Sequence, residues 1–139
     1  MSLLSICASA DGGTSCNIPS KGFGDGYGSF QIGKGPIHRR KFGPGYSNNA
    51  AEIEIIASAL TYIETQWDAS ELEVMFYSDS QVALAWLKAS AEGSLKKLSE
   101  GASEGMRSAI AVLRIIAPRF LLIRTEWHPR SKSVAAFGH

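Results

Sequence analysis

The first third of the chain begins with alternating apolar and polar positions and is predicted to contain three strands. Over residues 3–10, large apolar side chains alternate with small or polar ones, which is typical of a strand with one tightly packed face. Residues 11–26 are rich in Gly, Pro, Ser and Asn and predict a loop. A second strand is expected over residues 27–32 and a third over residues 38–46. The glycine-containing turn at residues 33–36 predicts that these two strands form an antiparallel hairpin.

The pattern then changes to helical spacing. Apolar side chains recur three and four positions apart at Ile53, Ile56, Ala57, Leu60 and Ile63. The preceding Ser47-Asn48-Asn49 supplies residues that commonly cap helices. If Asn49 is the cap, Glu52 takes the third helical position and completes a capping box.

A short apolar run and a second helix follow. Residues 74–77 are almost continuously apolar, which predicts a strand buried on both faces, as in a parallel arrangement. A helix is expected from about residue 80 to residue 91. Residues 92–105 are rich in Gly, Ser, Glu and Lys and predict a solvated connection with a short helix.

The last third predicts one more helix and one more strand. The helix spans roughly residues 103–117 and ends at Pro118. Residues 120–127 predict another buried strand, and residues 128–139 a tail with a short final helix. Strands mixed with helices in this order predict an α/β fold, with a mixed sheet covered by helices on both faces.

Composition narrows the class of protein. A length of 139 residues with 45% hydrophobic side chains predicts one folded domain over residues 1–139. The formal net charge of +1 argues against a strongly basic nucleic-acid clamp. Cys7 and Cys16 form no CxxC pair, so we expect no zinc site and a reduced, cytoplasmic protein. We also expect no membrane span and no secretory signal at Met1-Ser2-Leu3.

Three acidic residues stand where folding does not require an acid. Asp11 ends the first predicted strand, Glu52 lies in the first turn of the first helix, and Asp79 ends the run at residues 74–77. Strand ends and helix starts can meet at one edge of an α/β sheet. Carboxylate oxygens suit Mg²⁺ or Mn²⁺, and two such ions can bind a phosphodiester between them.

Each of these acids also has an ordinary structural interpretation. Asp11 precedes two glycines and could be a turn former. Glu52 could complement the helix dipole, and Asp79 could cap the helix that starts at Ser80. The combination favours a shared metal site, which requires the three carboxylates to lie within about 8 Å of one another.

Three short motifs carry a resemblance to a known family. They are Ala10-Asp11-Gly12-Gly13 with Asn17 and a glycine-rich stretch through Gly28, Asn48-Asn49-Ala50-Ala51-Glu52, and Tyr77-Ser78-Asp79-Ser80-Gln81. In order and spacing, over nearly the whole chain, they resemble the type-1 ribonuclease H family. The resemblance implies a ribonuclease H-like, five-stranded mixed sheet. Its first three strands are antiparallel, and its last two are parallel to the first.

The resemblance also implies a function and a set of site residues. Asp11, Glu52 and Asp79 become catalytic carboxylates that bind Mg²⁺ or Mn²⁺, with two ions present when substrate is bound. Asn17, Asn49 and Gln81 become substrate-binding residues. The implied activity is a metal-dependent endonuclease that hydrolyses the RNA strand of RNA/DNA hybrids. Amide side chains suit this substrate, because they donate to and accept from the 2′-hydroxyls and base edges of a wide minor groove.

One part of the family pattern is missing. The family has a fourth carboxylate in its last helix, and the corresponding position falls on Phe137, or on Ala136 if the register slips by one residue. Glu126 is a weak candidate to replace it. The missing acid supports an alternative, a non-catalytic or weakened ribonuclease H-like domain that binds nucleic acid. A DNA nuclease of the same superfold is a third hypothesis, which the Asn49 and Gln81 matches disfavour.

Two further features leave alternatives open. The basic run from His38 to Lys41 could protect a sheet edge or contact phosphates. Of the family's basic helical segment only Lys96-Lys97 remains, which predicts a weak grip on substrate. His128 follows Trp127 at a predicted strand end, so a structural role is favoured over that of a mobile histidine. The oligomeric state is left open.

Overall fold

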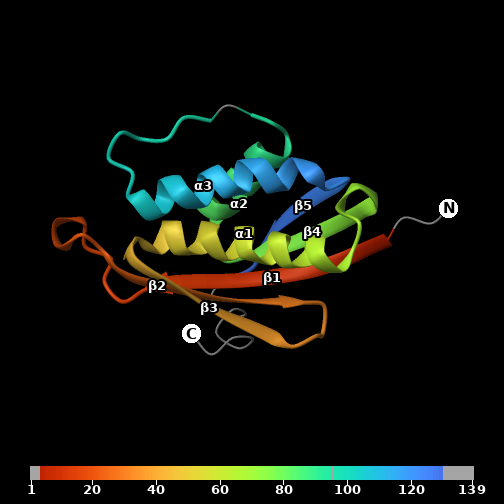
Figure 1. Cartoon of the computed structure of the whole chain (residues 1–139), viewed down its shortest axis with the longest axis horizontal. Helices are drawn as coiled ribbons and strands as arrows, with labels where there is room; N and C mark the ends of the chain where they lie inside the picture. The colour runs from red at the N-terminus through yellow and green to blue at the C-terminus, as the bar shows by residue number, and fades with distance from the viewer. Residues whose placement is uncertain (1–3, 95, 130–139) are drawn as a thin grey trace.

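The computed structural model describes residues 4–94 and 96–129, and these build a sheet with helices packed against it (Figure 1). The strands and helices, in chain order, are β1 (Leu4–Thr14), β2 (Gly24–Ile32), β3 (Ile37–Tyr46), α1 (Asn48–Gln66), β4 (Leu72–Ser78), α2 (Gln81–Ala91), α3 (Glu104–Ile116) and β5 (Leu122–Trp127). Short 3-10 turns occupy Pro19–Lys21, Ala69–Glu71 and Ala117–Arg119. None of the described helices is long and apolar enough to cross a membrane.

The predicted sheet is confirmed. Its strand order is β3-β2-β1-β4-β5. The pairs β1–β2 and β2–β3 are antiparallel, whereas β1–β4 and β4–β5 are parallel. The first three strands therefore form an antiparallel meander, and the last two run parallel to the first.

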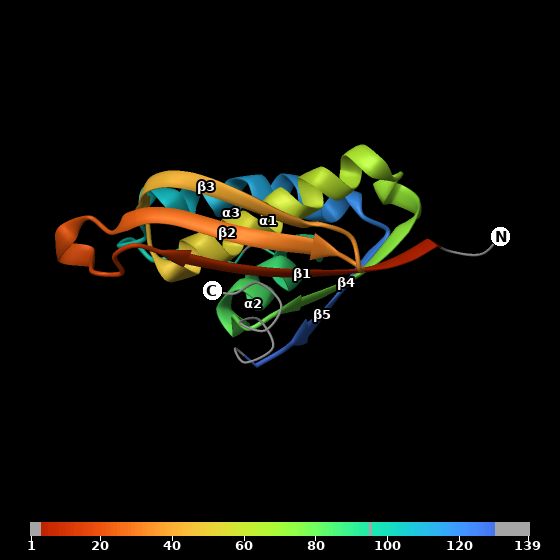
Figure 2. The same ribbon diagram turned by 90° about the horizontal axis from the view of Figure 1, so that it is seen from below.

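The core lies between the sheet and a layer of helices. Side chains from β1, β2 and β4 form one buried cluster with side chains of α1, α2 and α3, so the described helices cover the same face of the sheet. Figures 1 and 2 show these helices together on one side of the strands. For the described residues, the prediction of helices on both faces of the sheet is therefore wrong. The short final helix expected in the tail falls on residues 130–139, outside the described residues.

The first strand is longer than the sequence predicted. Asp11, Gly12, Gly13 and Thr14 pair with the early part of β2, so the predicted loop shrinks to residues 15–23. Asp11 therefore lies inside β1, and the prediction that it ends the strand is wrong. The composition of this segment suggests a loop, but the antiparallel partner supplies the backbone hydrogen bonds that hold it extended.

Three other local predictions are wrong. The strand β4 is not buried on both faces, because its exposure alternates between buried and half-buried positions along its length. The strand β5, predicted to be buried, is an exposed edge of the sheet and pairs only with β4 among the described strands. The described part of the α2–α3 connection contains no short helix.

Candidate functional site

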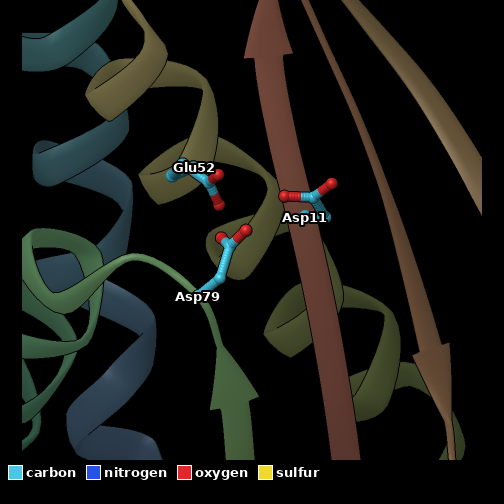
Figure 3. Close-up of side chains that lie close together, drawn as sticks. All are labelled: Asp11, Glu52 and Asp79. Atoms are coloured by element: carbon cyan, nitrogen blue, oxygen red, sulfur yellow. The ribbon is translucent and has the colours of Figure 1, made fainter. Parts of the chain in front are cut away.

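The three acidic residues converge, as the sequence predicted. Asp11 comes from β1, Glu52 from α1, and Asp79 from the residue after β4 (Figure 3). One carboxylate oxygen from each residue lies within 4.8 Å of the others. This separation is well inside the limit that a shared metal site requires.

The cluster lies beside the part of β1 that extends beyond its pairing with β4. The strand β1 pairs with β4 only as far as Ser9 and Tyr77, and β1 then continues to Thr14 without a strand on that side. Glu52 and Asp79 lie in the space beside Asp11 that a longer β4 would have filled. The end of β4 therefore creates the room for the three side chains.

Gly12 allows the first helix to approach β1. A Cβ atom built on Gly12 would lie 2.7 Å from the carbonyl carbon of Ala51 and 2.9 Å from the backbone nitrogen of Glu52. Any side chain at this position would push α1 away from the strand. The glycine thus brings the Glu52 backbone against β1, next to Asp11.

The ordinary structural interpretations do not account for the acids. Ser47 caps α1, since its hydroxyl accepts from the backbone nitrogen of Ala50 at 3.1 Å, so Glu52 lies beyond the first turn. Ser80 caps α2 in the same way. The predicted capping roles of Asn49 and Glu52, and the alternative capping role of Asp79, are therefore wrong. Asp11 is a paired strand residue rather than a turn former.

Burial and neighbouring charge strongly perturb Glu52. Its side chain is only 6% exposed, and Asp11 is 3% exposed. Burial, followed by the charges of Asp11 and Asp79, raises the pKa of Glu52 from its ordinary 4.5 to about 10. A backbone hydrogen bond from Gly12 opposes this shift only in part. At neutral pH and without a cation, Glu52 is therefore protonated and shares a hydrogen bond with Asp11.

The donor set fits a divalent cation. The oxygen Oε2 of Glu52 is buried, and within the described part of the chain it has no hydrogen-bond partner. A buried, unpaired carboxylate oxygen is costly unless a cation or a donor meets it. Three carboxylates in one place are typical of sites for hard cations such as Mg²⁺ or Mn²⁺.

The cluster opens to a cleft of about 460 Å³. Its lining residues come from β1, β2 and the starts of α1 and α2: Asp11, Gly12, Gly13, Thr14, Tyr27, Asn48, Asn49, Glu52, Asp79 and Ser80. Asn49 is the only one of the three predicted amides among them. Asn17 instead accepts a hydrogen bond from the backbone nitrogen of Asn48 at 2.9 Å, which ties the loop after β1 to the start of α1. Gln81 is exposed at the first position of α2.

The sequence interpretation missed a contact at Asp79. The indole Nε1 of Trp127 donates a hydrogen bond to the carbonyl oxygen of Asp79 at 3.0 Å. Because the two residues are far apart in the chain, no local pattern could have indicated the contact.

The remaining candidates near the site have other partners. Glu126 is exposed on β5, and one of its oxygens lies 3.7 Å from Nε2 of His128. It does not belong to the carboxylate cluster. The ring of His128 stacks on Tyr77, with centroids 4.3 Å apart, and its backbone nitrogen donates to Ser78. These contacts agree with a structural role for His128.

The predicted position of the missing fourth acid, at Ala136 or Phe137, lies outside the described residues. Within residues 4–94 and 96–129, the cluster of Asp11, Glu52 and Asp79 is the one group of three or more metal-ligating side chains. The described part of the site therefore supplies three carboxylates.

Comparison with known proteins gives matches at the level of structure. No protein-family model matches the chain, and no curated protein matches its sequence. RNase H1 from the halophilic archaeon Halobacterium salinarum is 17% identical, with a TM-score of 0.66 over 92% of this chain and 88% of that one. The N-terminal RNase H domain of a Mycobacterium tuberculosis protein is 17% identical, with a TM-score of 0.70 over 95% and 87%. LC11-RNase H1, solved in complex with an RNA/DNA hybrid, is 19% identical, with a TM-score of 0.70 over 94% and 89%.

Proposed function

Because the chain has the ribonuclease H-like fold, we propose that it is a metal-dependent endonuclease that hydrolyses the RNA strand of RNA/DNA hybrids. The observation that carries the proposal is the convergence of Asp11, Glu52 and Asp79 within 4.8 Å at an open cleft. The substrate class is suggested by LC11-RNase H1, a protein of the same fold that was solved with an RNA/DNA hybrid.

In this proposal the three carboxylates hold Mg²⁺ or Mn²⁺, with two ions in place when substrate is bound. Bound ions of this kind supply an activated attacking water and charge stabilisation for the leaving oxygen. The protein contributes rigid placement. Asp11 lies on a central strand, Glu52 on a buried helix face, and the backbone of Asp79 is held by Trp127. Glu52 has to release its proton before its carboxylate can serve as a ligand.

The amide side chains serve recognition in this proposal. Asn49 lines the cleft beside Glu52, where its amide can donate to and accept from a 2′-hydroxyl. Gln81 begins α2, two residues after Asp79, and in this proposal it contacts the same substrate. Asn17 acts indirectly, because its hydrogen bond positions the backbone at Asn48.

A cleavage assay tests the proposal. A hybrid with labelled RNA is incubated with the protein in Mg²⁺ and then in Mn²⁺, beside double-stranded DNA and double-stranded RNA of the same sequence. We expect internal cuts in the RNA of the hybrid only, and none with Glu52→Gln. Cuts in double-stranded DNA would instead favour a DNA nuclease of the same fold.

One observation favours a second candidate, a non-catalytic or weakened domain that binds nucleic acid. The described residues contribute three carboxylates to the cluster, and fewer ligands would weaken binding of a second ion. This candidate predicts that the protein binds the hybrid but does not cut it in either cation.

A further inference from the structure

The basic run on β3 is divided between the two faces of the sheet. The ring of His38 stacks on Phe30, with centroids 4.7 Å apart, and the guanidinium of Arg40 lies 5.3 Å from the centroid of the same ring. Phe30 is fully buried in the core under the helices. His38 and Arg40 therefore have a packing role at the edge of the core.

The other two basic residues belong to the opposite face. Arg39 pairs with Ser29, which in turn pairs with Asp11 on β1. Lys41 pairs with Tyr27, the partner of Gly13. Residues paired directly across strands share a face of the sheet. Two cross-strand rows thus run from the carboxylate strand β1 to a cation on the edge strand β3.

Arg39 is oriented toward the centre of the sheet. Its Nη1 donates to the hydroxyl of Ser29 at 3.3 Å, along the row that leads to Asp11. A charge that only protected the sheet edge would need no such inward contact. The hydrogen bond uses one donor of the guanidinium and leaves most of its fork for an anion.

A second hollow, next to the carboxylate cleft, is lined by these cations. It measures about 400 Å³ and is lined by residues of β2 and β3, among them Tyr27, Arg39 and Lys41. Tyr27 also lines the carboxylate cleft, so the two hollows share a wall. Arg39 and Lys41 are exposed on this surface.

We propose that Arg39 and Lys41 bind backbone phosphates of the nucleic acid beside the cut, so that the substrate runs from the carboxylates across Tyr27 to β3. This inference rests on the proposed function, which places the scissile phosphate at the cluster. Two interstrand spacings, about 10 Å, separate Arg39 from Asp11, so phosphates within a few nucleotides of the scissile phosphate lie within reach of these cations. A guanidinium and an ammonium at that distance match phosphates in geometry and charge.

Binding measured against salt tests the inference. Fluorescence anisotropy with a labelled RNA/DNA hybrid, in Ca²⁺ and over 50–200 mM salt, compares the wild type with the double variant Arg39→Gln/Lys41→Gln. The slope of log K against log salt is negative, and each lost phosphate contact reduces its magnitude by roughly 0.9. The double variant should therefore show a slope whose magnitude is smaller by about 2. The matched control Lys34→Gln/Arg107→Gln removes two exposed charges elsewhere and should keep the wild-type slope. The charge-conserving variant Arg39→Lys/Lys41→Arg should also retain most of it.

The position of the contact is tested with neutral methylphosphonate linkages. Placed at one of the first few linkages on either side of the cut, in one strand at a time, a linkage at the contacted position should weaken binding by the wild type and leave binding by the Arg39→Gln/Lys41→Gln variant unchanged. Circular dichroism and a thermal melt check that all three double variants are folded.

Failure of the inference can be separated from failure of the proposed function. If the wild type binds and cuts the hybrid but the Arg39/Lys41 variant keeps its slope, the phosphate contact is refuted and the endonuclease stands. If the slope falls as expected but no cutting occurs, the contact is supported and the endonuclease is refuted. A wild type that does not bind the hybrid at all overturns both.

Discussion

Replacing Glu52 with glutamine removes one ionisable group from the carboxylate cluster while keeping its size. Burial and the charges of Asp11 and Asp79 raise the pKa of Glu52 from 4.5 to about 10. Below about pH 4.5 the group is protonated in both the folded and the unfolded chain. As the pH rises, only the unfolded chain releases the proton, so the free energy of unfolding falls until about pH 10.

The size of this effect follows from the pKa difference. Between the two pKa values the wild type loses about 1.4 kcal/mol of stability per pH unit through this group. From about pH 5 to about pH 8 the loss is roughly 4 kcal/mol, which corresponds to a Tm difference on the order of 10 °C for a chain of this size. Glu52→Gln lacks the ionisation and should lose none of this stability.

Thermal melts and urea unfolding in EDTA, from about pH 5 to about pH 8, measure the difference. Glu52→Gln should be close to the wild type at the low end and clearly more stable at the high end. Glu71→Gln, an exposed glutamate in the turn before β4, serves as the matched control and should follow the wild-type curve.

Adding Mg²⁺ at the high end of this pH range should narrow the stability difference between the two proteins. An ion bound to the ionised Glu52 stabilises the wild type by about 2.7 kcal/mol when its concentration is one hundred times its Kd, and the variant should gain much less. A difference between wild type and Glu52→Gln that does not change with pH would refute the buried, charge-coupled state of Glu52. An equal rise of Tm with Mg²⁺ in both proteins would refute its role as a ligand.

Other substitutions test the remaining parts of the site. Asp11→Asn should abolish hybrid cleavage and leave the metal-free protein as stable or slightly more stable, because one repulsive charge is removed; an unchanged cleavage rate excludes Asp11 from catalysis. Asn49→Ala and Gln81→Ala should weaken binding of hybrid more than of duplex DNA, and equal losses on both would mean that the amides contact only phosphates. Trp127→Phe removes the hydrogen bond to Asp79 but keeps an aromatic ring, so calorimetry should give roughly tenfold weaker Mg²⁺ binding with little change in Tm; unchanged affinity would show that the indole does not position Asp79.

Periodicity and residue type alone were enough to predict most elements and the candidate acids. The helical spacing from Ile53 to Ile63 predicted α1, and all five of its predicted core residues are buried. The glycine-containing turn at residues 33–36, close to both flanking segments, predicted the β2–β3 hairpin. These signals are local, because the repeat of a helix or strand decides which side chains share a face.

Tertiary structure decided how those elements create a site. Asp11 became an interior strand residue because β2 pairs with the segment that composition assigned to a loop. The strand β5 became an exposed edge because no further strand among the described residues pairs with it. Hydrogen-bond partners and burial of this kind come from segments distant in the chain, which no window of sequence contains.

The chemistry of the candidate site depends on the same long-range arrangement. The sequence could nominate Glu52 as a ligand, but its raised pKa comes from packing against β1 and from charges on two other elements. The basic run at residues 38–41 was visible in the sequence, yet only strand pairing separates the cations beside Phe30 from those aligned with Asp11. The sequence specifies the residue types, whereas their desolvation and the distances between their charges are set only when the chain has folded.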